Sequence, residues 1–171
     1  MNMTNTLSRL AAVAVLSATT SLPLLADSAE ERLLAKIESG EAYSADTLMP
    51  LFKALEPVDL DFMLGSWKGG KFDGGKPDPI NWYGKRFNSP SDVEPLLVRD
   101  DEGEVVTYDK LGAAQMRMME FDDVSSAALI YDSQPIMDYF RQINEDVIVG
   151  LGDIKGQPLD FFFWLEREAA D

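Results

Sequence analysis

The sequence predicts a mainly β protein, an antiparallel β-barrel of about eight or nine strands behind one or two N-terminal helices. Short stretches rich in aromatic and branched residues recur about every ten residues from position 62 onward. Gly, Pro, Asn and Asp separate most of these stretches, and no helical pattern of about 10 to 15 residues lies between them. A β-sandwich is the alternative that this pattern leaves open.

The first 26 residues are typical of a signal peptide. Arg9 supplies a weakly positive start, residues 10–26 are apolar or small, and cleavage after Ala26, Ser28 or Ala29 fits the small residues there. The alternative is a buried N-terminal helix of a cytoplasmic protein. We therefore expect a periplasmic or secreted protein. No later stretch is apolar enough for stable membrane insertion.

Residues 27–60 are expected to form a helical segment. Ser28 can cap a first helix, and Ser44 or Asp46 can cap a second helix that stops before Pro57. Apolar residues recur at helical spacing in both. We expect these apolar faces to pack over the open end or the side of the barrel.

The β-domain is expected to cover residues 61–171. Its short, consecutive strands favour a meander that closes on itself, because closure removes exposed edges. The candidate strands lie at residues 62–72, 80–87, 93–99, 105–108, 114–121, 125–131, 136–142, 147–153 and 159–167. The irregular stretch 73–79 is either a lid at the mouth of a pocket or a long turn. The last strand is apolar on both faces, so we expect an N-terminal helix to cover it from outside.

Charge and composition exclude several classes of function. The chain has 15 Lys and Arg against 30 Asp and Glu, a formal net charge of −15, which disfavours nucleic acid and anionic lipid surfaces. It has no His and no Cys, which excludes disulfides, thiol nucleophiles, His-based triads and the common zinc, iron–sulfur and haem ligand sets. We therefore expect no cofactor, no metal and no nucleic-acid partner.

A tryptophan between glycines opens the predicted barrel, in the segment Gly65-Ser66-Trp67-Lys68-Gly69. Glycine weakens a strand, so its use here implies a bend, a bulge or a close approach of backbone. The indole of Trp67 can then fold under the barrel and fill its floor. A tryptophan that lines a ligand cavity is the alternative interpretation.

Several segments together resemble the GXWXG protein family and the domain of unknown function that accompanies it. They are residues 61–70, 82–87, 130–132, 135–141, 150–156 and 161–165. The resemblance divides the β-domain into a GXWXG part at about 61–110 and a C-terminal part at about 111–168. It implies kinship but almost no function. More loosely, the Gly-x-Trp strand is similar to those of lipocalin-like and nitrobindin-like barrels, which hold a small apolar ligand. Nitrobindin-like proteins bind haem through a histidine, so haem binding does not carry over to this chain.

The first candidate site is the strand at 82–87. Strict alternation places Trp82 and Arg86 on one face, and Tyr83 and Lys85 on the other. Arg86 beside Trp82 would bind a carboxylate or phosphate of a ligand within an apolar cavity. The alternative is a solvated face whose bases pair with surface acids.

The second candidate site lies in the C-terminal part. Asp138 stands within an apolar strand and, if buried, needs a partner such as Arg86 or Lys155. Such a carboxylate can serve as a general base, although a structural ion pair explains the same pattern. Asp132 precedes a turn, which it can cap, and Arg141 lies on the strand face opposite Asp138.

The leading hypothesis is an exported barrel that binds a small, largely apolar or amphipathic molecule in an internal cavity. The alternative is a cofactor-independent enzyme of the isomerase, hydratase or decarboxylase type. Asp138 or Asp132 would be its base, with Arg and Lys side chains around an oxyanion, and the polar groups must then converge on one cavity. A third hypothesis, an adaptor, predicts a filled interior and a large exposed apolar patch. The predicted ligand-binding residues are Trp82, Tyr83, Lys85, Arg86, Asp138, Arg141 and Lys155.

Overall fold

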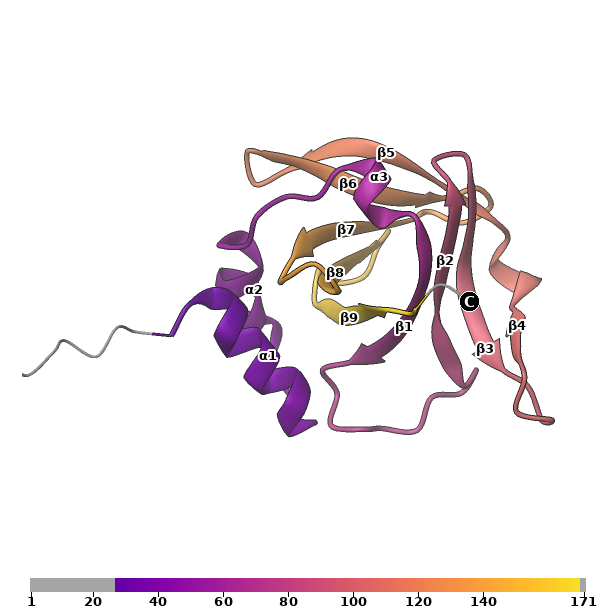
Figure 1. Ribbon diagram of the computed structural model, residues 1–171, viewed down its shortest axis with the longest axis horizontal. Coiled ribbons are helices and arrows are strands. Elements are labelled where there is room, and N and C mark those ends of the chain that lie inside the picture. The colour runs from indigo at the N-terminus through magenta and orange to yellow at the C-terminus, as the bar shows by residue number, and fades with distance from the viewer. Residues whose placement is uncertain (1–26, 170–171) are drawn as a thin grey trace, which may run out of the picture.

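A computed structural model describes residues 27–169 (Figure 1). The predicted signal peptide, residues 1–26, lies outside the described residues. Three helices come first: α1 (Ala29–Ser39), α2 (Ala45–Lys53) and α3 (Leu60–Met63). Nine strands follow, with a short 3-10 helix (Asp109–Leu111) between the fourth and the fifth. The predicted mainly β class with N-terminal helices is therefore confirmed.

All strand pairs are antiparallel. The strands are β1 (Gly65–Lys71), β2 (Trp82–Ser89), β3 (Asp92–Arg99), β4 (Val105–Thr107), β5 (Ala114–Phe121), β6 (Val124–Tyr131), β7 (Ile136–Gln142), β8 (Val147–Ile154) and β9 (Phe161–Arg167). The sheet order is β2-β1-β9-β8-β7-β6-β5-β3-β4, and a further pairing of β2 with β3 closes it into a ring from which β4 projects. This barrel-like ring agrees with the predicted barrel rather than with the sandwich.

Adjacent strands of the ring are paired over different numbers of residues. Strands β1 and β9 are joined by five residue pairs, from Trp67 opposite Arg167 to Lys71 opposite Phe163. Strands β3 and β5 share a single pair, Val93 opposite Ala114. The ring is therefore closed, but β3 and β5 are joined by far fewer paired residues than β1 and β9.

The first strand begins later than predicted. Residues 62–64 were expected in the strand, but Phe62 and Met63 belong to α3 and β1 starts at Gly65. The side chain of Asp59 caps α3 by accepting a hydrogen bond from the amide of Phe62 at 2.7 Å. Gly65 then leaves the helix with φ of 120°, a backbone conformation that favours glycine. The prediction was wrong here because a local cap outweighs the strand pattern.

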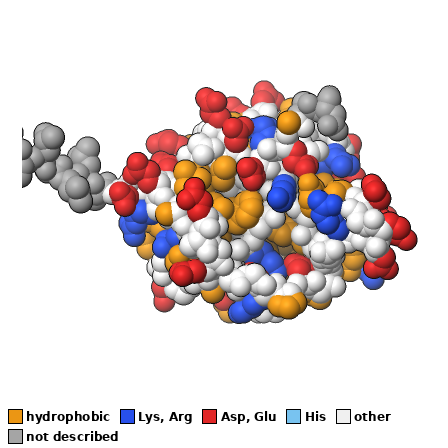
Figure 2. All heavy atoms as spheres, turned by 60° about the horizontal axis from the view of Figure 1, so that its bottom comes forward, with side chains coloured by type: hydrophobic (Ala, Val, Ile, Leu, Met, Phe, Trp, Pro, Cys, Tyr) orange, Lys and Arg blue, Asp and Glu red, His pale blue; other side chains and the backbone are white. Residues whose placement is uncertain are grey.

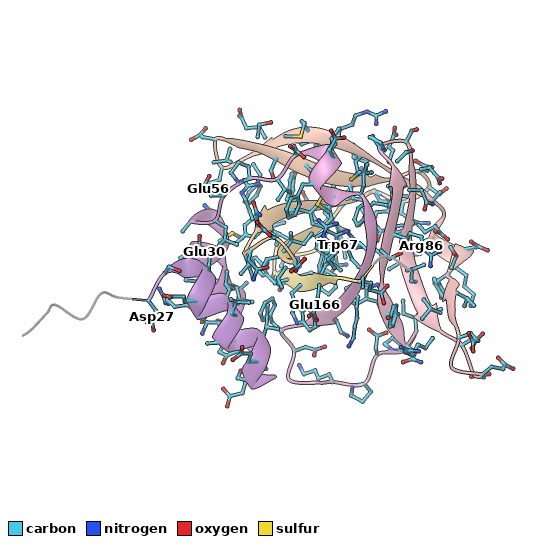
Figure 3. All side chains as sticks on the ribbon, in the orientation of Figure 1. Asp27, Glu30, Glu56, Trp67, Arg86 and Glu166 are labelled. Carbon is cyan, nitrogen blue, oxygen red and sulfur yellow. The ribbon has the colours of Figure 1, made fainter. Side chains whose placement is uncertain are left out.

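Trp67 fills one end of the ring. Its side chain is fully buried and points into the ring, and its indole Nε1 donates to the carbonyl of Met63 at 2.8 Å (Figure 3). The guanidinium of Arg167 lies 4.1 Å from the ring centroid of Trp67 and donates to the carbonyls of Phe62 and Leu64 at 2.7 and 2.9 Å. Helix α3, β1 and β9 are thereby tied together at a closed end, as the structural interpretation of Trp67 predicts.

Helices α1 and α2 cover the outer face of the ring on one side (Figure 1). Phe52 of α2 is buried and packs edge-on against Phe162 of β9, with ring centroids 5.8 Å apart. Phe163 and Leu165, the alternate residues of β9, are buried in the interior cluster with Trp67. The last strand is thus covered on both sides, as predicted. Each such buried apolar side chain stabilises the fold by about 1.5–3 kcal/mol.

Candidate functional site

The end of the ring opposite Trp67 contains a cavity of about 290 Å³. Its walls are mostly apolar and include Trp82 of β2, Ile136 of β7, Ile154 of β8 and Phe163 of β9. Asp78, in the connection between β1 and β2, lies at its rim. Figure 2 shows the side of the molecule on which this connection runs, with acidic side chains spread over the surface rather than gathered in one patch. The cavity is therefore an apolar recess in an acidic protein.

A buried ion pair lies in the wall of this cavity. The ammonium of Lys85 on β2 is 2.9 Å from Oδ2 of Asp138 on β7, and each side chain is only 3% exposed. The same ammonium donates to the phenol oxygen of Tyr131 on β6 at 3.2 Å and to the carbonyl of Pro95 on β3 at 3.0 Å. Burying two charges costs several kcal/mol, and this set of contacts offsets that cost. Strands distant in sequence thus meet in one polar cluster, Lys85–Tyr131–Asp138.

The protonation states of the cluster follow from its surroundings. Burial favours the neutral amine of Lys85, but the charge of Asp138 and the hydrogen bonds of the cluster outweigh burial and raise its pKa to about 12. The pKa of Tyr131 is also raised to about 12, chiefly by burial, with the positive charge of Lys85 opposing. At neutral pH the cluster therefore contains an ammonium and a neutral phenol. An ammonium is not a nucleophile, so Lys85 is unsuited to Schiff-base chemistry.

Irregularities in β2 decide which of its side chains face the cavity. Strict alternation predicted Trp82 and Arg86 on one face and Lys85 on the other, which is wrong. The register between β2 and β3 shifts on both sides of Gly84, so Trp82 and Lys85 both line the cavity. Arg86 instead lies 3.0 Å from Glu94, partly exposed outside the cavity. A side chain at Gly84 would collide with the carbonyl oxygen of Trp67, which explains the glycine at this bulge.

Glycines leave room for the cavity walls. A methyl group at Gly69 would collide with the indole of Trp82, and one at Gly150 with the ring of Phe163. At Gly152 it would lie 2.7 Å from the ring of Phe161 and 3.4 Å from Oδ1 of Asp138. Small residues on β1 and β8 therefore allow aromatic rings and one carboxylate to occupy the interior.

A second group of charged side chains forms ion pairs at the rim of the cavity. The ammonium of Lys71, at the end of β1, lies 3.1 Å from Asp73 and 2.9 Å from Asp78. Burial favours the neutral form of each group, but the hydrogen bonds and charges of the cluster outweigh burial. They raise the pKa of Lys71 and lower the pKa values of Asp73 and Asp78. We call these three residues the rim latch, because they tie the β1–β2 connection to the mouth.

Three predicted ligand-binding residues, Trp82, Lys85 and Asp138, meet at the cavity. Tyr83 lies elsewhere, where its hydroxyl donates to Glu168. Lys155 is exposed beside a separate shallow pocket. Asp138 was expected to need a cationic partner, and the structure supplies Lys85 instead of Arg86 or Lys155.

Arg141 is buried on the other side of β7, as its predicted face implies. Its guanidinium donates to the carbonyls of Phe140 and Phe121, both at 3.0 Å, and lies 5.3 Å from the ring centroid of Phe52. Burial lowers its pKa, with Asp122 opposing. Arg141 thus joins the ring to α2 and does not reach the cavity. Asp132, the other predicted base, is exposed and does not line the cavity.

Tyr131 is the member of the buried cluster that the sequence interpretation missed. It ends β6, on the same face as the buried Leu129, and the following hairpin brings Ile136 and Asp138 beside it. Period-2 alternation along the predicted strand 125–131 was the signal that could have placed it inside.

Within residues 27–169, no cluster of three or more acidic side chains is arranged to hold a metal ion. No helix in that part of the chain combines the length and hydropathy needed to cross a membrane.

Two family models match the sequence. The model of the GXWXG protein matches residues 50–103, and that of a domain of unknown function (DUF4334) matches residues 112–167. The crystal structure of a protein from Thermomonospora curvata is similar in fold, with a TM-score of 0.77 and 47% sequence identity over 82% of this chain and 99% of that one. No curated protein matches. The chain belongs to the GXWXG protein family, with the domain of unknown function as its C-terminal part.

Proposed function

We propose that the protein binds a small, largely apolar molecule in the cavity at the open end of the ring. The observation that carries this proposal is an apolar cavity of about 290 Å³ with the buried cluster Lys85–Tyr131–Asp138 in its wall. Ligand sites typically combine apolar walls with a few placed polar groups. The volume equals that of about ten water molecules, which suits a ligand of about a dozen non-hydrogen atoms.

The adaptor hypothesis has less support. Among the described residues, the large apolar side chains with substantial exposure are Val106, Met118, Leu159 and Phe161, which belong to different elements. Phe161 is at the mouth of the cavity, where an exposed aromatic ring suits ligand entry. An interior with free volume, together with exposed large apolar side chains that are spread over different elements in residues 27–169, favours a ligand over a protein partner.

Native mass spectrometry of the protein purified from its own host tests the proposal. We expect a retained small molecule in the wild-type protein and none in Ile154→Trp, because the indole would occupy the cavity. Val106→Trp, on the projecting strand β4, is the matched control and should keep the molecule. A wild-type protein without bound ligand, or a ligand unaffected by Ile154→Trp, would contradict the proposal.

The convergence of the cluster on the cavity also favours a second candidate, an enzyme that moves a proton on the bound molecule. Asp138 would act as the base and the phenol of Tyr131 would donate a hydrogen bond to the developing oxyanion, with Lys85 positioning both. Incubation of the retained molecule with protein in D₂O tests this. We expect deuterium in the molecule with wild-type protein and not with Asp138→Asn, and equal incorporation without protein would contradict it.

We also propose that the chain is exported and that cleavage occurs after Ala26. The support lies in the start of α1. Ser28 and Glu31 form a capping box, with backbone to side-chain hydrogen bonds of 2.9 and 3.2 Å. Cleavage after Ala26 would keep this cap, whereas cleavage after Ala29 would remove Ser28. The mass of the protein in the periplasmic or culture fraction should correspond to a chain that begins at Asp27, and a full-length chain in the cytoplasmic fraction would contradict export.

A further inference from the structure

The ammonium of Lys85 has no hydrogen left for a ligand. It contacts three oxygens, those of Asp138, Tyr131 and Pro95, and an ammonium has three hydrogens. It also lies 5.1 to 5.8 Å from the ring centroids of Phe163, Tyr131 and Trp82. Lys85 is therefore a positioning residue that holds the phenol and the carboxylate in place.

The groups that remain available are a donor and an acceptor. The phenol oxygen of Tyr131 accepts from Lys85, and its own hydrogen has no acceptor among residues 27–169. Oδ2 of Asp138 is buried and faces the ammonium of Lys85, whereas Oδ1 accepts no hydrogen bond from residues 27–169 although the side chain lines the cavity. Because both groups touch the same ammonium, at 3.2 and 2.9 Å, one small head group can reach both.

The charges at the cavity select against ionised ligands. Asp138 offsets Lys85, so a carboxylate ligand would meet Asp138 with no free cation to receive it. At the rim it would meet Lys71, but that ammonium is already paired with both Asp73 and Asp78. An amine would meet the ammonium of Lys85 in front of rings that this ammonium already occupies. An alkylammonium could donate to Asp138, but the charge of that carboxylate is already paired with Lys85. Either ionised ligand would therefore lose its water without gaining an unpaired counter-charge, which is costly.

Building on the proposed binding function, we infer that the ligand is a neutral molecule whose head group both donates and accepts a hydrogen bond, namely an alcohol or a primary amide. Its oxygen accepts from the phenol of Tyr131, and its O–H or N–H donates to Asp138. This inference replaces the acid-bearing ligand that Arg86 had suggested, since Arg86 is bound to Glu94 outside the cavity.

Calorimetric titration with four probes that share an eight-carbon body tests the inference: 1-octanol, octanamide, octanoate and octylammonium at pH 7.5. We expect 1-octanol and octanamide to bind about tenfold or more tightly than the two ions. Tyr131→Phe should weaken 1-octanol about 3- to 10-fold, the usual effect of one neutral hydrogen bond. Tyr83→Phe makes the same change outside the cavity and should leave all four affinities unchanged.

The variant Asp138→Asn should reverse the order of the four affinities. Lys85 would lose its counter-charge, so octanoate should become the tightest of the four probes. If this variant does not fold, the double variant Lys85→Met/Asp138→Leu removes both charges. It should weaken 1-octanol, because the alcohol loses Asp138 as its acceptor, and octanoate should still bind less tightly than 1-octanol, because the cavity offers it no cation.

The outcomes separate the two proposals. If the wild-type protein binds none of the four probes, both the binding function and the ligand class are overturned. If it binds all four equally or octanoate most tightly, or if Tyr131→Phe leaves 1-octanol unchanged, only the ligand class is overturned.

Discussion

The two ends of the ring contain similar residues but differ in how many hydrogen-bonding groups remain without a partner. Each end has a tryptophan beside a basic side chain, Trp67 with Arg167 at the closed end and Trp82 with Lys85 at the open end. The guanidinium of Arg167 donates to backbone carbonyls, which belong to the fold itself. At the open end the cation holds a phenol and a carboxylate that retain hydrogen-bonding capacity toward a cavity. A buried cation therefore indicates a ligand site only where its partners still have capacity to bind something else.

The largest expected effect concerns the ion pair at the open end. Asp138→Leu should lower the free energy of unfolding by about 3–5 kcal/mol, because it leaves the ammonium of Lys85 buried without a counter-charge. The double variant Lys85→Met/Asp138→Leu should recover most of this loss, since apolar side chains of similar size often replace a buried pair without cost. Urea denaturation measures both, and a double variant no more stable than the single one would show that the charges themselves do not decide stability.

A smaller loss is expected at the closed end. Arg167→Met should cost about 2 kcal/mol, because the carbonyls of Phe62 and Leu64 lose their donors while the methionine keeps part of the packing on Trp67. Binding at the open end should be unchanged. Urea denaturation together with titration of 1-octanol measures the two effects, and a loss of binding equal to that of Tyr131→Phe would mean that the two ends are coupled.

Tyr131→Phe should change stability by less than about 1 kcal/mol while it weakens the binding of 1-octanol about 3- to 10-fold. The ring stays buried, and Lys85 keeps Asp138 and Pro95 as partners. A loss of stability as large as that of Asp138→Leu would mark the tyrosine as structural, like Trp67.

The smallest effect concerns the rim latch and its dependence on pH. The pKa values of Asp73 and Asp78 are lowered in the folded protein, so their contribution is present above the ordinary aspartate pKa and is lost as the pH falls through the lowered values. The pKa of Lys71 is raised, so its contribution is complete below the ordinary lysine pKa and is lost only as the pH rises through the raised value.

These groups are partly exposed, so the whole effect should stay below about 1 kcal/mol. In urea denaturation at several pH values, the free energy of unfolding should fall less steeply on acidification for Asp78→Asn than for the wild-type protein. The matched variant Asp101→Asn, in an exposed turn, should show the same fall in the free energy of unfolding on acidification as the wild-type protein.

Much of the fold follows from local pattern. The predicted strands 114–121 and 136–142 coincide with β5 and β7, and apart from the first strand every other predicted boundary falls within two residues. Alternating apolar residues between Gly, Pro, Asn and Asp turns determine these elements without help from the rest of the chain. The exception, Phe62 and Met63 in α3, also has a local cause, the Asp59 cap.

The site was less predictable because it depends on contacts across the ring. Asp138 was identified as an unusual charge, but its partner Lys85 is on β2, which is not adjacent to β7 in the sheet. The orientation of Arg86 was missed because the bulge at Gly84 arises from its close approach to the backbone of Trp67, which alternation does not contain. The spacing of residues along one strand predicts which side of the sheet each side chain occupies. It does not predict which charges pair across the interior, because that depends on how the sheet closes into a ring.

Because β3 and β5 share a single residue pair, we expect this part of the ring to deform more easily than the other strand pairings. A closed sheet distributes strain around its circumference, and strain concentrates where the fewest hydrogen bonds resist it. Leu96 of β3 and Leu111 just before β5 flank this sector, and both line the cavity. Widening the ring here would enlarge the cavity without disturbing the five pairs that join β1 to β9 beside Trp67. If the cavity binds a ligand as proposed, we expect the β3–β5 side to yield to ligands of different width while the β1–β9 side keeps the tryptophan floor in place.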